Sequence, residues 1–87
     1  MKKITMFFQR SCPYCIAALR YMDDLFAENP GYLSLEIEKI DELAHPGIAK
    51  TYDYYYVPTL YVGDKKLHEG AASPESIKLV LDAAMKG

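Results

Sequence analysis

The sequence predicts an α/β fold in the order β-α-β-α-β-β-α, with a four-stranded mixed sheet and helices on both of its faces. Short apolar or alternating runs of strand length are separated by longer runs whose apolar residues recur at helical spacing. A hairpin signal at Gly63-Asp64 makes the last two strands antiparallel, whereas a helix between two strands favours a parallel crossover. Because 87 residues suffice for one core, we expect residues 1–87 to form a single domain.

Composition and charge narrow the class of partner. Hydrophobic residues make up 51% of the chain and charged residues 25%, which is typical of a globular protein. The formal net charge is -2 and the basic residues cluster only in pairs, so we expect no nucleic-acid partner. No apolar run could span a bilayer, and the one at residues 4–8 is too short for a signal peptide. We therefore expect a cytoplasmic monomer without a membrane partner.

The first strand and the first helix have the strongest patterns. Residues 3–8 are almost continuously apolar, which predicts a central strand covered on both faces. After a short polar loop, Pro13 suits the first turn of a helix. Apolar residues then recur at steps of four, three and four, at Cys15, Leu19, Met22 and Phe26. This stripe predicts an amphipathic helix that ends at Asn29-Pro30-Gly31.

The middle of the chain has weaker signals. Apolar residues alternate with polar ones over residues 33–38, which predicts a strand buried on one face. A short helix is expected over residues 46–52, with Ile48, Ala49 and Tyr52 on its inner side.

The C-terminal part predicts a hairpin and a helix. Strands at residues 60–62 and 66–69 flank the Gly63-Asp64 turn. Ser73-Pro74 is a good cap and first-turn pair for the last helix. Its expected inner stripe consists of Ile77, Val80, Leu81, Ala84 and Met85.

Chemistry points to the only two cysteines, Cys12 and Cys15, at the start of the first helix. The positive end of a helix favours a thiolate, and Arg10 stands two residues earlier, so we expect an exposed Cys12 with a lowered pKa. Cys15 lies on the buried stripe and should stay a thiol until it attacks a mixed disulfide on Cys12. Pro13 stiffens the turn between them, and Tyr14 projects outward, where it would line a substrate groove.

Two other uses of the cysteines explain the sequence less well. A structural disulfide would close so small a loop that it would constrain the unfolded chain little. A zinc site would need two more ligands, and the remaining candidates, His45 and His68, lie on distant segments without zinc-finger spacing. The pattern therefore favours redox chemistry, with no metal.

Two motifs together carry a family resemblance. The stretch Cys12-Pro13-Tyr14-Cys15 follows an apolar strand, and Val57-Pro58-Thr59 precedes a later one. This combination, with the predicted element order over the whole chain, resembles the glutaredoxins of the thioredoxin superfamily.

The resemblance implies a thioredoxin-like fold whose first strand lies between the second strand and the hairpin. It implies that Cys12 is the nucleophile and Cys15 the resolving thiol. Pro58 would be cis and pack beside the cysteines, and the backbone of Val57 would bind a peptide or glutathione. Glutathione would be a co-substrate, with no tightly bound cofactor.

Some positions differ from the glutaredoxin pattern. Glutaredoxins usually have a Gly-Gly pair and then a cap that holds a carboxylate of glutathione, where this chain has Gly70-Ala71-Ala72-Ser73. Ala72 and Ser73 are the matching candidates, and Arg10 is one step displaced from the family's usual basic residue. The Gly70-Ala71 pair and the Val-Pro-Thr motif also occur in small thioredoxins, which are recycled by flavoprotein reductases.

Three hypotheses follow. The first is a dithiol oxidoreductase that reduces protein or glutathione mixed disulfides. The second is a small thioredoxin recycled by a flavoprotein reductase. The third, of another class, is a non-catalytic metal or iron–sulfur carrier, although Pro13 argues against the cluster.

Three features have alternative interpretations. Ser73 is also interpretable as a plain helix cap, and Arg10 as a solvated loop charge. The tyrosines at residues 54–56 could serve as packing or as a hydrophobic docking rim.

Overall fold

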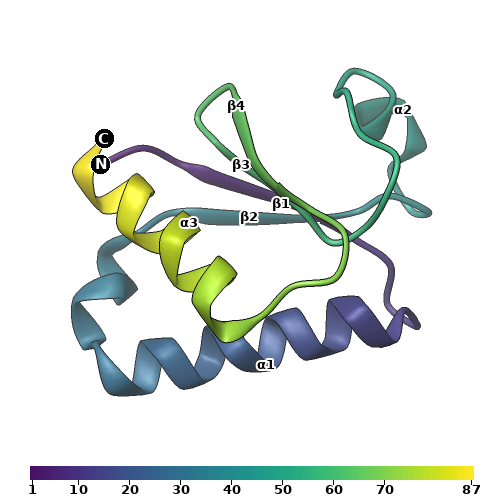
Figure 1. Cartoon of the computed structure of the whole chain (residues 1–87). Coiled ribbons are helices and arrows are strands. Elements are labelled where there is room, and N and C mark those ends of the chain that lie inside the picture. Colours follow the sequence, from purple (N-terminus) through teal and green to yellow (C-terminus); the bar gives the residue numbers. More distant parts are fainter.

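The predicted order of elements is present in the structure, a computed structural model that describes residues 1–87 (Figure 1). A short 3₁₀ helix, η1, is the one element that the sequence patterns did not indicate. The elements are β1 (Ile4–Phe8), α1 (Pro13–Glu28), η1 (Pro30–Ser34), β2 (Ile37–Asp41), α2 (Pro46–Ala49), β3 (Thr59–Val62), β4 (Lys65–Glu69) and α3 (Pro74–Lys86).

The four strands form one mixed sheet in the order β2-β1-β3-β4. The first strand is central, as the resemblance implied: β1 pairs parallel with β2 and antiparallel with β3, and Phe7 lies opposite both Ile40 and Thr59. The β3–β4 hairpin turns at Gly63, whose φ of 61° lies in the left-handed region that glycine adopts without strain. Consequently β1 and β2 end, and β3 begins, at the same end of the sheet.

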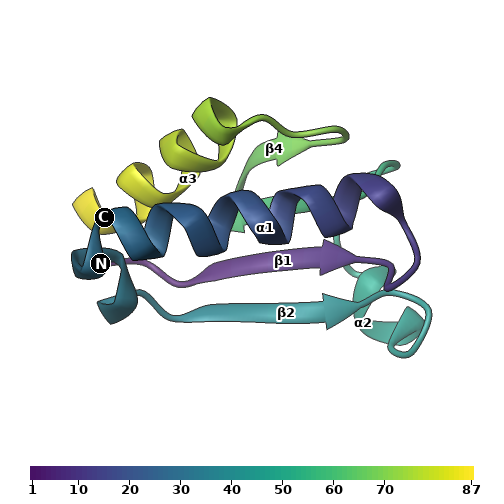
Figure 2. The same cartoon turned by 90° about the horizontal axis from the view of Figure 1, so that it is seen from below.

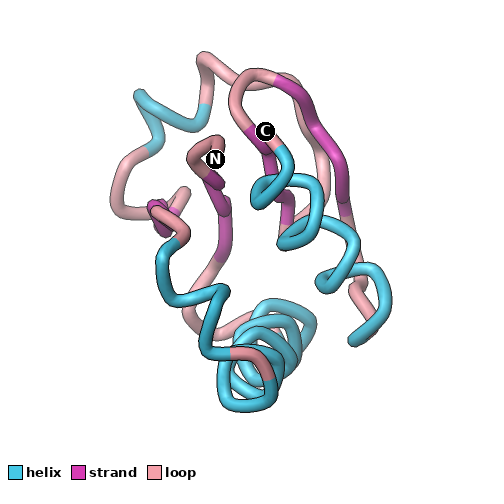
Figure 3. Tube along the Cα trace, turned by 90° about the vertical axis from the view of Figure 1, so that its left-hand side faces the viewer, coloured by secondary structure: helices cyan, strands magenta, loops and turns pink.

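Helices cover both faces of this sheet, as predicted. Figure 3 shows α1 and α2 on opposite sides of the strands. Under α1 and α3 lies the large core, a cluster of 13 buried hydrophobic residues that includes Ile4, Met6 and Met22. On the other face Phe7, Ile40 and Tyr61 form a smaller cluster with partly buried Tyr52 and Tyr54 against them, which we call the aromatic cluster. The alternation along β1 therefore divides its side chains between two cores.

The two long helices bury most of the predicted residues. On α1, Cys15 and Met22 are buried, and Leu19 and Phe26 pack partly buried against the large core. On α3 the predicted stripe is buried except for Met85, which is 37% exposed because it lies in the last turn of the helix.

The strand predicted over residues 33–38 is wrong in position. The Asn29 side chain accepts a hydrogen bond from the Gly31 N–H, and Pro30 begins a 3₁₀ turn rather than a strand. This turn brings Tyr32 into the large core and leaves Leu33 66% exposed. Alternation over six residues did not reveal that β2 begins only at Ile37, where pairing with β1 starts.

The second helix is shorter than predicted. It spans Pro46–Ala49, and the hydroxyl of Thr51 donates to the Ile48 carbonyl just after the helix ends. Ala49 and Tyr52 pack against the aromatic cluster as expected, whereas Ile48 is 46% exposed and not inward.

None of the helices is both long enough and apolar enough to cross a lipid bilayer.

Candidate active site

The two cysteines lie at the end of the sheet where β1 and β2 terminate and α1 begins (Figure 2). Cys12 is the residue that caps the helix. Its N–H donates to the Gln9 carbonyl at 3.2 Å, and its carbonyl accepts the N–H groups of Cys15 at 3.1 Å and Ile16 at 3.0 Å. Pro13 occupies the first helical position, where its missing N–H leaves no bond unmade. These hydrogen bonds position Cys12 between the loop after the central strand and the first turn of α1.

The two thiols are in different environments, as the sequence predicted. Both are free thiols, with Cys12 half-buried and Cys15 only 1% exposed. Hydrogen bonding from the Cys15 backbone N–H is the main cause that lowers the pKa of Cys12, and the Cys15 thiol and the Tyr14 N–H act in the same direction. Burial is the main cause that raises the pKa of Cys15 to about 11. Cys12 is therefore the thiol that ionises first.

Arg10 does not contribute to this difference in the way its position suggested. Its Nε lies 3.4 Å from Oδ2 of Asp41, the last residue of β2, and its side chain is 87% exposed. The structure pairs Arg10 with the end of the neighbouring strand. The backbone amides of the first helical turn are what favours the Cys12 thiolate.

Pro58 forms part of the same end of the molecule. The Val57–Pro58 peptide bond is cis, as the resemblance implied. Because β3 begins at Thr59, opposite Phe7, the register places Pro58 beside the end of β1, from which the loop to Cys12 starts. The backbone N–H and C=O of Val57 have no hydrogen-bond partner within the protein. An extended peptide next to Cys12 would find these two groups available for pairing.

The tyrosines at residues 54–56 were interpreted either as packing or as a docking rim, and the structure places them in different environments. Tyr54 stacks on Phe7 with ring centroids 4.8 Å apart, so it belongs to the packing of the aromatic cluster. Tyr55 and Tyr56 are 86% and 69% exposed, and Tyr14 at the start of α1 is 60% exposed. These three, which we call the exposed tyrosines, are available to a partner.

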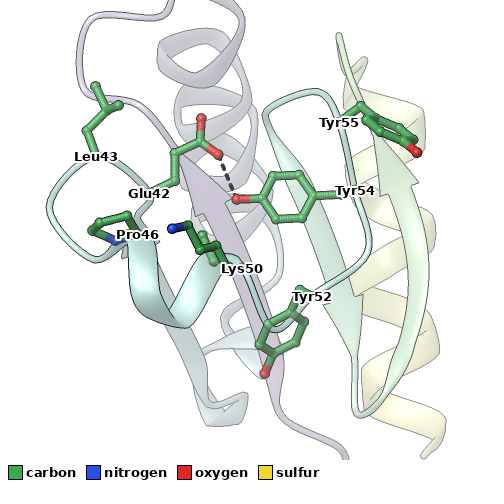
Figure 4. A pocket seen from close by; sticks show the side chains of 8 residues that line it. Glu42, Leu43, Pro46, Lys50, Tyr52, Tyr54 and Tyr55 are labelled. Atoms are coloured by element: carbon green, nitrogen blue, oxygen red, sulfur yellow. Dashed lines mark hydrogen bonds between the residues drawn. The ribbon is translucent and has the colours of Figure 1, made fainter.

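A pocket of about 300 Å³ lies between α2 and the following loop (Figure 4). Its wall includes Glu42, whose carboxylate accepts hydrogen bonds from the Tyr54 hydroxyl at 2.6 Å and the Gln9 side-chain amide at 2.5 Å. Glu42 thus connects the ends of β1 and β2 to the loop before Pro58. Sequence patterns did not indicate this residue, because Gln9 and Tyr54 are brought close to it only by the fold.

The candidates for binding glutathione are placed as follows. The Ser73 hydroxyl accepts the Ser76 N–H at 3.0 Å, and the Ser76 hydroxyl accepts the Ser73 N–H at 2.9 Å, which completes a capping box for α3. Ser73 therefore has the helix-cap role that was its alternative interpretation. Ala72 is partly buried against the large core.

No group of three or more His, Cys, Asp or Glu side chains is arranged to hold a metal ion. His68 hydrogen-bonds to the Gly70 carbonyl, and His45 precedes the first residue of α2.

Comparisons with known proteins identify the family of the chain. Residues 2–82 match the sequence model of the family described as Thioredoxin domain. The thioredoxin of Methanocaldococcus jannaschii is 31% identical over 75 residues, which cover 86% of this chain and 86% of that protein.

Solved structures show the same fold. A thioredoxin-like protein from Clostridium perfringens is 25% identical, with a TM-score of 0.68 over 97% of this chain and 71% of that one. The oxidised thioredoxin from Plasmodium falciparum is 16% identical, with a TM-score of 0.69 over 92% of this chain and 77% of that one. The α/β fold is thus thioredoxin-like, and the resemblance is confirmed at the level of the superfamily. The chain belongs to the thioredoxin domain family.

Proposed function

We propose that the protein is a thiol–disulfide oxidoreductase of the thioredoxin type, which reduces disulfide bonds in other proteins. The observation that carries this proposal is the asymmetry of the two thiols. Cys12 caps a helix, is accessible and has a lowered pKa, whereas Cys15 is buried one turn later and has a raised pKa. A dithiol reductase needs one thiol that attacks the substrate disulfide and a second that remains protonated until the mixed disulfide has formed.

The reaction proceeds in two exchanges. The Cys12 thiolate attacks one sulfur of the substrate disulfide, forms a mixed disulfide and releases the other substrate sulfur as a thiolate. Cys15 then loses its proton and attacks the Cys12 sulfur, which forms the Cys12–Cys15 disulfide and releases the second substrate thiolate. The substrate gains two electrons and, after protonation, two thiols. The two protein thiols supply both electrons, so these steps need no bound cofactor.

Proteins are the substrate class that best fits the surface around Cys12. The unpaired backbone groups of Val57 suit an extended peptide segment, and the exposed tyrosines Tyr14, Tyr55 and Tyr56 add apolar contact area. We propose that the protein acts as a cytoplasmic monomer on disulfide-containing proteins.

For the reductant we propose a flavoprotein thioredoxin reductase. Two side chains that were candidates for binding glutathione have partners within the protein: Ser73 caps α3 and Arg10 pairs with Asp41. The relative from Methanocaldococcus jannaschii is itself named a thioredoxin. Glutathione is the second candidate, which the Cys12-Pro13-Tyr14-Cys15 motif favours through its resemblance to glutaredoxins.

The test compares two electron sources for reduction of insulin by the purified protein. One reaction contains NADPH and a thioredoxin reductase, and the other contains NADPH, glutathione reductase and glutathione. We expect faster NADPH consumption with thioredoxin reductase. Faster turnover with glutathione would instead favour the glutaredoxin hypothesis.

Two variants test the assigned roles. Cys12→Ser should be inactive with both reductants, and Cys15→Ser should accumulate a covalent mixed disulfide with the substrate. An active Cys12→Ser variant would refute the mechanism. Iron or zinc retained by a protein without any reductase activity would support the carrier hypothesis instead.

A further inference from the structure

We propose that Glu69, on the edge strand β4, is a positioning residue that holds the loop at residues 53–57 against the sheet and thereby sets the affinity for protein disulfides. The second half of this proposal rests on the proposed function, whereas the first half concerns the loop alone. Glu69 lies outside the cysteine motif and was not among the site residues that the sequence indicated.

The contacts of Glu69 are directed at the loop backbone. Its Oε2 accepts the N–H groups of two consecutive residues, Tyr55 at 2.5 Å and Tyr56 at 3.0 Å. Its Oε1 accepts a hydrogen bond from Nζ of Lys66 at 2.8 Å. One carboxylate therefore binds two backbone amides while a lysine fixes its orientation. Charge-assisted hydrogen bonds of this kind are stronger than those between neutral groups.

The strand that carries Glu69 is itself well placed for this role. Glu69 pairs with Thr59 in the β3–β4 ladder. Thr59 follows Val57 and Pro58 directly in the chain. Glu69 is thus presented by the sheet to a loop that has no helix or strand of its own. A rigid element holds a site more accurately than a loop can hold itself.

Neighbouring side chains fasten other points of the same loop. The Tyr61 hydroxyl and Nζ of Lys66 donate to the Asp53 carbonyl at 2.7 Å and 3.2 Å. The Thr59 hydroxyl donates to the Tyr56 carbonyl at 2.5 Å. Both backbone groups of Tyr56 are therefore held by the sheet, the N–H by Glu69 and the C=O by Thr59.

The consequence concerns the next residue, Val57, whose backbone N–H and C=O remain without an internal partner. With Tyr56 fixed on one side and the β3 strand on the other, Val57 can present these groups in one direction only. The rings of Tyr55 and Tyr56 are exposed. Without Glu69, the loop would have to be ordered when a substrate binds, and that entropy would be lost from the binding free energy.

Glu69 is expected to hold the loop at every pH in the neutral range and not to respond to pH there. The Lys66 ammonium group, followed by the amides of Tyr55 and Tyr56, lowers the pKa of Glu69 to about 2. The carboxylate therefore stays ionised across the neutral range.

The experiment compares Glu69→Ala and Glu69→Gln with a matched control, Glu38→Gln. Glu38 is also a carboxylate on an edge strand, and it pairs with Lys3 at 2.9 Å, but it lies on β2 at the opposite edge of the sheet. For each variant, kcat and KM are measured with insulin and with a small aromatic disulfide, and amide hydrogen exchange is measured at Tyr55 and Tyr56.

For Glu69→Ala we expect KM for insulin to rise about 5- to 10-fold, because one or two backbone residues must be reordered on binding. Turnover of the small disulfide should be unchanged, and the amides of Tyr55 and Tyr56 should exchange at least about 10-fold faster. Glu69→Gln, which keeps one acceptor oxygen, should show a smaller change, and Glu38→Gln none. A Lys66→Met variant, which keeps both amide bonds, should also show a smaller change than Glu69→Ala.

Three outcomes would overturn the proposal. Unchanged KM with both amides still protected would show that Glu69 does not hold the loop. Equal losses with insulin and the small disulfide, together with a lower Tm, would show a general effect on stability. An inactive wild-type protein would refute the proposed function and with it the effect on affinity, while the exchange data would still decide whether Glu69 positions the loop.

Discussion

The two faces of the sheet are stabilised in different ways. Beneath α1 and α3, 13 buried residues interlock as the large core, and most of them are aliphatic. On the other face the cluster of buried hydrophobic residues has only three members, Phe7, Ile40 and Tyr61. Side-chain hydrogen bonds hold the overlying loop there, with Tyr61 as a donor and Glu42 and Glu69 as acceptors. The first face therefore supplies most of the stability, and the second positions the wall of the candidate site. Substitutions should separate these two roles.

The largest effect on stability is expected from Met22→Ala in the large core. Met22 is 1% exposed, and its truncation should lower the free energy of unfolding by about 2–5 kcal/mol. Reductase activity per folded molecule should stay unchanged, because no loop contact is lost. Denaturant unfolding checks the first point, with Leu79→Ala, a 71% exposed position on α3, as the control. A loss below that of the control would contradict the assignment of stability to this face.

A smaller loss is expected from Tyr52→Leu in the aromatic cluster. The Tyr52 ring packs against Phe7 and Tyr61 with centroid distances of 4.6 and 5.0 Å. Losing both aromatic pairs should lower the free energy of unfolding by about 1–2 kcal/mol. KM for insulin should also rise, because Tyr52 precedes the loop that carries Val57. A lower free energy of unfolding with an unchanged KM for insulin would count against a positioning role for this face.

Tyr61→Phe should have a milder effect. It removes only the hydroxyl that donates to the Asp53 carbonyl at 2.7 Å, and the ring remains. We expect a loss of about 1 kcal/mol in unfolding free energy and faster amide exchange within the loop. Tyr56→Phe is the matched control, since the 69% exposed Tyr56 ring makes no hydrogen bond through its hydroxyl. Equal behaviour of the two variants would mean that the Asp53 contact contributes nothing.

The smallest expected effect is a dependence of the unfolding free energy on pH in the acid range. The pKa of Glu69 is lowered from 4.5 to about 2 in the folded protein, so its contribution to stability is complete above pH 4.5 and is lost as the pH falls through 2. Unfolding of the wild type and of Glu69→Gln should therefore differ by a constant amount from pH 7 to 4.5. Below that pH the two curves should converge. A difference that persists unchanged at pH 2 would show that the charge of Glu69 is irrelevant.

Sequence patterns predicted the face with the large core better than the other. The stripe from Cys15 to Phe26 and the Ser73 cap were sufficient for α1 and α3, because long amphipathic helices with caps follow local rules. The strand after α1 was misplaced, because the turn at Asn29 and Pro30 and the pairing with β1 decided where β2 begins. Over so few residues, alternation cannot show which of them will find a neighbouring strand.

The candidate site was also predicted only in part. The contrast between Cys12 and Cys15 was predicted from their positions on the helix, with Arg10 as a second expected cause for Cys12, and the structure shows this contrast. Glu42 and Glu69 could not be found in the same way, because each bonds to residues that the fold, and not the sequence, brings close. Arg10 is the opposite case, because it is close to Cys12 in sequence but pairs with Asp41 in the structure.

The most direct test of the central claim is the pH dependence of alkylation by iodoacetamide, measured on the reduced protein with mass spectrometry of each cysteine. The claim predicts that Cys12 is labelled first, with a midpoint below the ordinary value of 9.0, and that Cys15 resists labelling until near pH 11. In a Cys15→Ala variant, Cys12 should still react, with a higher midpoint because no side-chain donor at residue 15 supports the thiolate. Labelling of Cys15 before Cys12, or a wild-type Cys12 midpoint at or above 9.0, would contradict the division of roles.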